Sequence, residues 1–279
     1  MLIEINGHQV NIEDEGERRH PAVVLLHHGL GSAAAWRKQM PVLSEAGFRS
    51  IAYDRWGYGK SDERSGIDMP DFTQDLLDLE RLLDELKLER AALVGHSDGG
   101  TIALFFAAAH PERVSCLVTV AAHVYVEEKM QPGIVSVQQA FESDWRFREG
   151  LRRAHGEKFE QAFHNWFDGW RDCGCESWDL RPTVAAITCP VLVVQGMEDE
   201  HATPQHAIDI AAAIPGAELW LVEGARHMLP QENAEAFNPR LLEFLCEHIL
   251  GSSSPNGIGI PVRRTGPQGL GFSTDQRND

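Results

Sequence analysis

Apolar and polar positions alternate along this chain in blocks that predict strands and helices in turn. Unbroken apolar runs, typical of strands buried on both faces, occupy residues 22–26, 91–94 and 190–194. Leucines at helical spacing predict an amphipathic helix over residues 72–86, and apolar segments predict helices over 101–109 and 204–214. Strands that alternate with helices predict a parallel sheet covered on both faces.

Weaker patterns complete this α/β arrangement. Residues 2–13 alternate around Asn6-Gly7, which predicts an N-terminal strand or hairpin. Further elements are expected as helices at residues 34–46 and 232–250 and as strands at residues 48–53, 114–120 and 218–222.

The alternation stops after residue 122 and resumes near residue 188. The intervening residues look mainly helical, and one helical face carries aromatic residues spaced four, three and four apart: Phe159, Phe163, Trp166 and Trp170. Such a stripe serves either core packing or ligand contact. An insertion at this point lies above the carboxyl edge of the sheet, where open α/β sheets bind ligands. We therefore expect a helical lid.

The same pattern divides the chain into four parts. Residues 1–122 and 188–250 form the two halves of one α/β core, and residues 123–187 form the lid. Residues 251–279 are rich in Gly, Ser and Pro and show no periodicity, so we expect a disordered tail.

The pentapeptide Gly95-His96-Ser97-Asp98-Gly99 joins a predicted buried strand to a predicted buried helix. A serine on such a tight turn is held in a strained conformation with its hydroxyl exposed. The glycines let the helix start pack close to the strand, and the helix N-terminus aims N–H groups at an anion forming near Ser97. The motif predicts a nucleophilic serine.

A nucleophilic serine needs a base, and the base needs an acid that orients it. With the serine first in the chain, the acid follows a later strand and the histidine comes last. Asp199 lies in the loop after the strand that ends at residue 194, with Glu198 and Glu200 as competitors. His227 is the histidine in the loop between the last strand and the last helix.

The oxyanion of acyl transfer needs two N–H donors. One is expected to be the backbone N–H of Asp98, directly after the nucleophile. The other is expected to be that of Leu30, in the loop at residues 27–32, where glycines allow close approach. We expect His28 to brace this loop rather than to titrate in catalysis.

Taken in order, these segments resemble the α/β-hydrolase superfamily. The resemblance spans residues 20–250 and rests on the loop at 28–29, the segment 54–61, the Ser97 turn, the loop at 196–199 and His227. It implies an α/β-hydrolase fold, with a mostly parallel sheet flanked by helices, and a Ser97, Asp199 and His227 triad. Asp199 is then favoured over both glutamates, and segment 54–61 has a structural role.

Within the superfamily the chain resembles the valacyclovir hydrolase-like α-amino acid ester hydrolases. The cues are Ser97-Asp98-Gly99-Gly100, the segment 121–126 and Trp166-Phe167-Asp168-Gly169. This resemblance implies that Asp98 holds the α-ammonium group of a substrate. We also expect His28 and Trp166 to be substrate-binding residues. Cys173-Gly174-Cys175 has no counterpart in the pattern.

The expected function is hydrolysis of a small carboxylic ester through an acyl-enzyme. A lactonase, a thioesterase and a carbon–carbon bond hydrolase with the same triad are the alternatives among enzymes. Epoxide hydrolases and haloalkane dehalogenases of this fold use an aspartate nucleophile, so Ser97 argues against them. A catalytically silent receptor is the alternative of another class, because fold alone does not establish activity.

The composition limits which binding partners and which cellular compartment we expect. A net charge of −17 disfavours nucleic acid and anionic membrane surfaces, so we expect a small-molecule ester as the partner. The five cysteines form no framework and no paired zinc motif, which indicates free thiols, a reducing compartment and no zinc site. The expected triad implies no metal or organic cofactor. No signal pattern and no apolar run of about 18 residues occurs, so we expect a soluble cytoplasmic protein.

Overall fold

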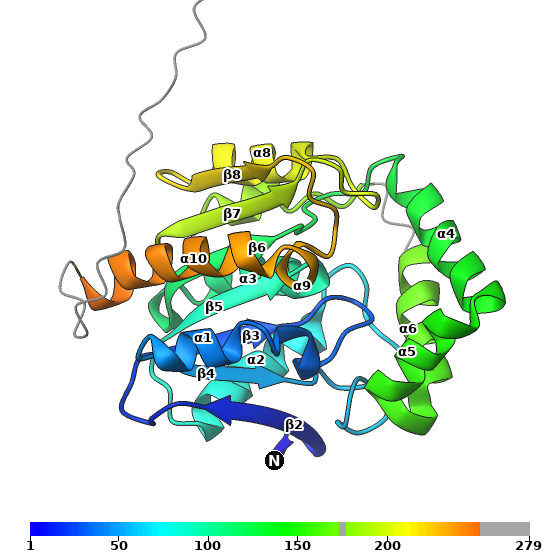
Figure 1. Cartoon of the computed structure of the whole chain (residues 1–279), viewed down its shortest axis with the longest axis horizontal. Coiled ribbons are helices and arrows are strands. Elements are labelled where there is room, and N and C mark those ends of the chain that lie inside the picture. Colours follow the sequence, from blue (N-terminus) through cyan, green and yellow to red (C-terminus); the bar gives the residue numbers. More distant parts are fainter. Residues whose placement is uncertain (173–176, 252–279) are drawn as a thin grey trace, which may run out of the picture.

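A computed structural model describes residues 1–172 and 177–251. Within them, one eight-stranded sheet runs through the molecule in the order β1-β2-β4-β3-β5-β6-β7-β8 (Figure 1). Its strands are β1 (Leu2–Ile5), β2 (His8–Glu15), β3 (Ala22–Leu26), β4 (Arg49–Tyr53), β5 (Ala91–His96), β6 (Val114–Val120), β7 (Val191–Gly196) and β8 (Glu218–Val222). β1 pairs antiparallel with β2, β2 pairs antiparallel with β4, and the other neighbours pair parallel. The expected mostly parallel sheet is confirmed.

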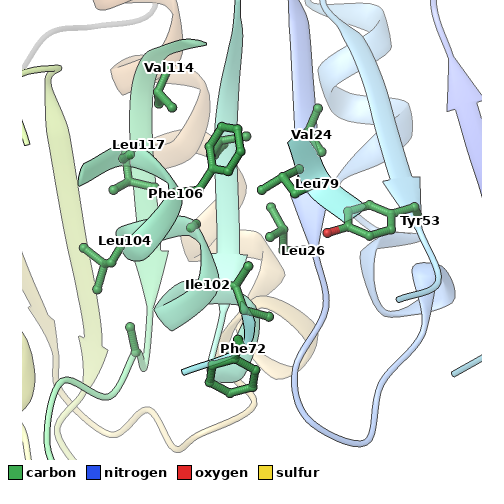
Figure 2. Close-up of a cluster of buried hydrophobic side chains, with 14 of the residues drawn as sticks. Val24, Leu26, Tyr53, Phe72, Leu79, Ile102, Leu104, Phe106, Val114 and Leu117 are labelled. Atoms are coloured by element: carbon green, nitrogen blue, oxygen red, sulfur yellow. The ribbon is translucent and has the colours of Figure 1, made fainter. Parts of the chain in front are cut away.

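Helices cover both faces of this sheet, and others stand beyond its edge. The helices are α1 (Met40–Glu45), α2 (Thr73–Glu85), α3 (Asp98–Ala109), α4 (Met130–Ser143), α5 (Trp145–His155), α6 (Phe159–Asp172), α7 (Arg181–Val184), α8 (Gln205–Ala213), α9 (Leu229–Glu232) and α10 (Ala234–Leu245). Leu79 of α2 and Phe106 of α3 belong to one buried cluster with residues of β3 and β4 (Figure 2). Leu43 of α1 and Phe237 of α10 belong to a second buried cluster.

The central strands owe their composition to burial on both sides. β3, β4, β5 and β7 are buried at every position, which is why their sequences are almost continuously apolar. In the parallel register Leu26 lies opposite Gly95, and His96 lies opposite Val120. The loops that leave β3, β5 and β6 therefore meet at one edge of the sheet.

Helices α4 to α7 belong to residues 123–187, which we call the helical insertion. In Figure 1, α4, α5 and α6 stand together beyond the carboxyl edge of the sheet. The ring of Phe141 in α4 stacks on that of Phe163 in α6, with centroids 3.7 Å apart, and Phe163 stacks on Phe167 at 5.6 Å. Phe163 of the predicted aromatic stripe thus packs inside the insertion itself.

Two predicted helices are divided in the structure. Residues 34–46 form a 3₁₀ turn (Ala33–Trp36) and then α1, which starts beside Pro41. Proline suits a first helical turn because its missing N–H has no partner there. The helix predicted over residues 232–250 is α9, a break at Asn233 (φ −112°), α10 and a π turn (Cys246–Leu250).

Two sequence-based predictions fall wholly or partly outside the described residues. They concern the tail after Gly251 and Cys173-Gly174-Cys175. Among the helices of the described ranges, none has the length and apolar character that a membrane span requires.

Candidate active site

Ser97 occupies a sharp turn between β5 and α3, at the carboxyl edge of the sheet. Its backbone has φ 56° and ψ −122°, a conformation that persists only where neighbouring contacts impose it. A β-carbon at Gly95 would collide with the carbonyl of Gly99, and one at Gly99 would collide with the carbonyl of Leu26. Glycine is required at both positions because strand, turn and helix approach so closely.

His227 and Asp199 form a hydrogen-bonded pair beside this turn. Nδ1 of His227 lies 2.8 Å from Oδ2 of Asp199, and the backbone N–H of His201 donates to Oδ1 at 2.8 Å. Burial opposes the charge of Asp199, but the hydrogen bond and charge of His227 lower its pKa below the ordinary value. A charged carboxylate only accepts, so Nδ1 of His227 carries a proton, and in the neutral ring Nε2 is the nitrogen with the lone pair.

Neither of the competing glutamates, Glu198 and Glu200, bonds the imidazole ring of His227. The side chain of Glu198 is exposed to solvent. Glu200 accepts the backbone N–H of His227 at 3.1 Å and a guanidinium N–H of Arg226 at 2.9 Å. Of the three acids, Asp199 is the one whose carboxylate bonds the imidazole ring.

Ser97 and His227 border one cavity of about 310 Å³, together with Leu30 and Asp98. The helical insertion contributes an apolar wall that consists of Met130, Ile134, Val137, Phe147, Leu151 and Trp170. Among residues 1–172 and 177–251, no hydrogen bond joins the Ser97 hydroxyl to the His227 ring. Such contacts often tighten only when a substrate is bound.

The loop after β3 carries Leu30 and is braced by a neutral imidazole. Nδ1 of His27 lies 2.8 Å from the carbonyl oxygen of His28, and Nε2 accepts the backbone N–H of Arg55 at 3.0 Å. Burial, and then the charge of Arg55, lowers the pKa of His27 well below its ordinary value. His28 lines the cavity, and burial, followed by the neighbouring His96, lowers its pKa well below the ordinary value.

Asp98 begins α3 directly after Ser97, and it is 1% exposed. The indole N–H of Trp170 donates to Oδ1 at 3.3 Å, whereas Oδ2 has no hydrogen-bond partner in the described residues. Burial raises the pKa of Asp98 to about 6, against the lowering effects of Arg55 and Trp170. Trp166 also lines the cavity, and its indole N–H has no partner within the described ranges.

Arg55 is a site residue that the sequence analysis missed, since segment 54–61 was expected to be structural. Its guanidinium is buried, 3.1 Å from Asp75 and 3.9 Å from Asp98 Oδ2. The carboxylate beside Ser97 therefore has a partial counter-charge without any ligand. The available signal was Asp75, an acid four residues before Leu79 on the apolar face of the helix predicted at 72–86.

Two further histidines of the cavity were not among the sequence-based candidates. The ring of His123 lies parallel to that of His227 to within 17°, at 6.2 Å, and the ring of His201 stands across it at 4.6 Å. Burial lowers the pKa of His123 well below its ordinary value and lowers that of His201 to about 4. In a chain with 13 histidines, no sequence signal selects these two.

Comparison with known proteins agrees with this geometry. A sequence model of the α/β-hydrolase fold matches residues 21–183, more than half of the chain. The relative "Serine hydrolase BPHL" from Homo sapiens is 30% identical over 249 residues, which cover 87% of this chain and 85% of the relative. From Comamonas testosteroni, "2-hydroxy-6-oxononadienedioate/2-hydroxy-6-oxononatrienedioate hydrolase" is 25% identical, with 87% and 93% covered.

Solved structures also match this fold. The enol-lactonase from Burkholderia xenovorans LB400 matches with a TM-score of 0.71 and 28% identity, over 88% of this chain and 100% of that one. The mostly parallel sheet agrees with what the sequence predicts for this family. The chain belongs to the α/β-hydrolase fold family.

Proposed function

We propose that this chain is a serine hydrolase that cleaves small carboxylic esters through an acyl-enzyme. One observation carries the proposal: the hydrogen-bonded Asp199–His227 pair borders the same cavity as Ser97 on its strained turn. Acyl transfer needs this combination of a nucleophile, a base and an acid that orients the base.

In the proposed reaction, Ser97 Oγ attacks the ester carbonyl carbon while Nε2 of His227 takes the hydroxyl proton. The tetrahedral oxyanion collapses, the bond to the alcohol breaks, and His227 returns the proton to the leaving oxygen. Water then attacks the acyl-enzyme with His227 as base, which releases the acid and restores Ser97. Asp199 fixes the tautomer of the ring and stabilises its positive charge.

The proposed oxyanion donors are the backbone N–H groups of Leu30 and Asp98. The N–H of Asp98 lies at the start of α3, where the aligned peptide dipoles favour negative charge. Donors fixed in advance act on charge that develops only in the transition state, so they raise kcat more than they lower KM.

Asp98 and its surroundings favour α-amino acid esters as the substrate class. Its unpartnered Oδ2 offers an acceptor to an α-ammonium group, and His28 and Trp166 line the same cavity. Arg55 offsets part of the carboxylate charge, so the pull on an ammonium is weaker than that of an isolated carboxylate. In this proposal the helical insertion acts as a lid whose apolar wall receives the rest of the acyl group.

Labelling with a serine-directed fluorophosphonate tests the nucleophile. The wild type should take up one adduct on the peptide that carries Ser97, and Ser97→Ala should take up none. Ser136→Ala, which removes an exposed hydroxyl on α4, is the matched control and should label like the wild type. Equal labelling of Ser97→Ala would exclude Ser97 as the nucleophile.

A substrate panel separates the remaining hydrolase types and the silent receptor. The panel consists of an aryl acetate, a lactone, a thioester and a vinylogous β-diketone. These are substrates for an esterase, a lactonase, a thioesterase and a carbon–carbon bond hydrolase, respectively. The proposal requires the highest kcat/KM for the ester. No turnover of any of them, with Ser97 unlabelled, would favour a receptor.

A further inference from the structure

A second imidazole, from a distant part of the chain, contacts the loop that carries Leu30. His155 is the last residue of α5 and is 3% exposed. Its Nδ1 accepts the backbone N–H of Gly59 at 2.9 Å, and its Nε2 lies 3.1 Å from the carbonyl oxygen of Leu30. The helical insertion thus contacts the oxyanion loop and the segment after β4 through one ring.

The partners of His155 determine its protonation. A backbone N–H can only donate, so Nδ1 must be the unprotonated nitrogen. Nε2 then carries the proton and donates it to the carbonyl of Leu30. Burial lowers the pKa of His155, against the effect of its bond to Leu30, so the ring stays neutral around pH 7. His27 carries its proton on the other nitrogen and braces the same loop from the core side.

The contact at Leu30 bears on the residue whose N–H is the proposed oxyanion donor. The backbone N–H of Gly31 donates to the carbonyl of His28 at 2.9 Å, which closes the turn around Leu30. The carbonyl of Leu30 and the N–H of Gly31 belong to one peptide group, so His155 and His28 together hold both polar atoms of that peptide. The N–H of Leu30 belongs to the adjoining Gly29–Leu30 peptide, the central peptide of this closed turn, so the bond from His155 restrains its direction through the next peptide group.

We infer that His155 is a positioning residue, through which the docked helical insertion orients the oxyanion donor of Leu30. The inference rests on the proposed function, because it assumes that Leu30 donates to an oxyanion. His155 itself acts through the Leu30 carbonyl and touches no reacting atom in this scheme. Loss of its bonds should lower kcat and leave KM nearly unchanged, because the oxyanion exists only during reaction.

The test compares two nearly isosteric variants, His155→Gln and His155→Met. Glutamine keeps a donor and an acceptor, whereas methionine keeps neither. Loss of a whole oxyanion donor costs about 10²–10³ in kcat, so misorientation in His155→Met should cost on the order of 10- to 100-fold. His155→Gln should recover most of that loss. Inhibition by a trifluoromethyl ketone, whose adduct carries the oxyanion, should weaken in parallel with kcat.

The matched control is Asn165→Leu. Asn165 of α6 donates from Nδ2 to the backbone carbonyl of Arg64 at 2.7 Å, so it joins the insertion to the core away from the Leu30 loop. This variant should keep kcat near the wild-type value. Equal losses in Asn165→Leu and His155→Met would show a general effect of loosening the insertion and would overturn the inference.

A measurement on the wild type covers the case in which His155→Met does not fold. Nitrogen-15 NMR of labelled histidine, assigned with His155→Gln, should show Nδ1 unprotonated and Nε2 protonated at pH 7. The opposite tautomer or a charged ring would overturn the inference. A wild type that labels at Ser97 and turns over esters, with His155→Met folded and fully active, would reject this inference alone. A wild type that does neither rejects the proposed function.

Discussion

Lys129 donates a hydrogen bond from its ammonium group to the backbone carbonyl of Asp199, with 2.6 Å between Nζ and O. The same ammonium donates to the carbonyl of Ala202 at 3.1 Å. Nearby, the carboxylate of Glu127 accepts the hydroxyl of Thr203 at 2.8 Å. The start of the helical insertion is thus bound to the loop that carries the proposed acid.

Lys129→Met should loosen this loop and lower kcat. A hydrogen bond from a charged group contributes about 1.5–3 kcal/mol, and part of that loss should appear as misalignment of Asp199. We expect a loss in kcat of about tenfold, since 1.4 kcal/mol corresponds to a factor of ten. Lys38→Met is the control, because Lys38 likewise donates to a backbone carbonyl, that of Gln231, and neither residue lines the cavity. Equal kcat in both variants would argue against a role for Lys129.

Asp199→Asn should keep the fold and lose about 10⁴-fold in kcat, because an amide favours the wrong tautomer of the His227 ring. Steady-state kinetics with an aryl ester and a thermal melt together measure this. Glu198→Gln, at an exposed side chain, should behave like the wild type. Near-normal turnover in Asp199→Asn would transfer the acid role to Glu200, whose carboxylate already bonds the backbone of His227.

Asp98→Asn should abolish a preference for substrates with a free α-amine. A charge-assisted hydrogen bond contributes about 1.5–3 kcal/mol, or on the order of 10- to 100-fold in kcat/KM. The comparison is an α-amino ester against its N-acetyl analogue in both proteins. Asparagine keeps the backbone N–H, so hydrolysis of the neutral ester should survive. A wild type that treats both esters alike would leave Asp98 as a residue that favours the helix start.

The amine preference should also depend on pH in a predictable direction. Burial raises the pKa of Asp98 to about 6, so the carboxylate loses its charge as the pH falls through that value. The preference should therefore fade below about pH 6 and again above about pH 7.7, where an α-amine loses its own proton. The ratio of kcat/KM for the two esters in wild type measures this. The same ratio in Asp98→Asn should show no decline on the acid side.

Much of the fold follows from local pattern. The run Ala22-Val23-Val24-Leu25-Leu26 is apolar throughout because β3 is covered on both faces, so its composition alone reveals the strand. The turn at Ser97 was equally accessible, because close approach forces glycine at positions 95 and 99. Asp199 was distinguished from its acidic neighbours only by family resemblance, and then by its contact with the His227 ring.

The site contacts that could not be predicted from the sequence join residues that are far apart in the chain. Arg55 and Asp98 are 43 positions apart and meet only because β4 and β5 both pair with β3. His155 contacts Leu30 across 125 positions, which no local periodicity encodes. The break between the 3₁₀ turn and α1 was missed because the apolar spacing of residues 34–46 outweighed the signal of Pro41 in that prediction.

The junction between β6 and β7 is a position where the helical insertion could be exchanged. β6 and β7 are direct neighbours, with Leu117 opposite Val191, although the whole helical insertion separates them in the chain. A foreign insertion joined between these strands would leave the strand register intact while it replaced the wall of the cavity. Such chimeras should fold readily, yet those that lack counterparts of Lys129 and His155 should turn over slowly. New substrate ranges obtained by exchanging the insertion would then be limited by the contacts of Lys129 and His155 with the core rather than by folding.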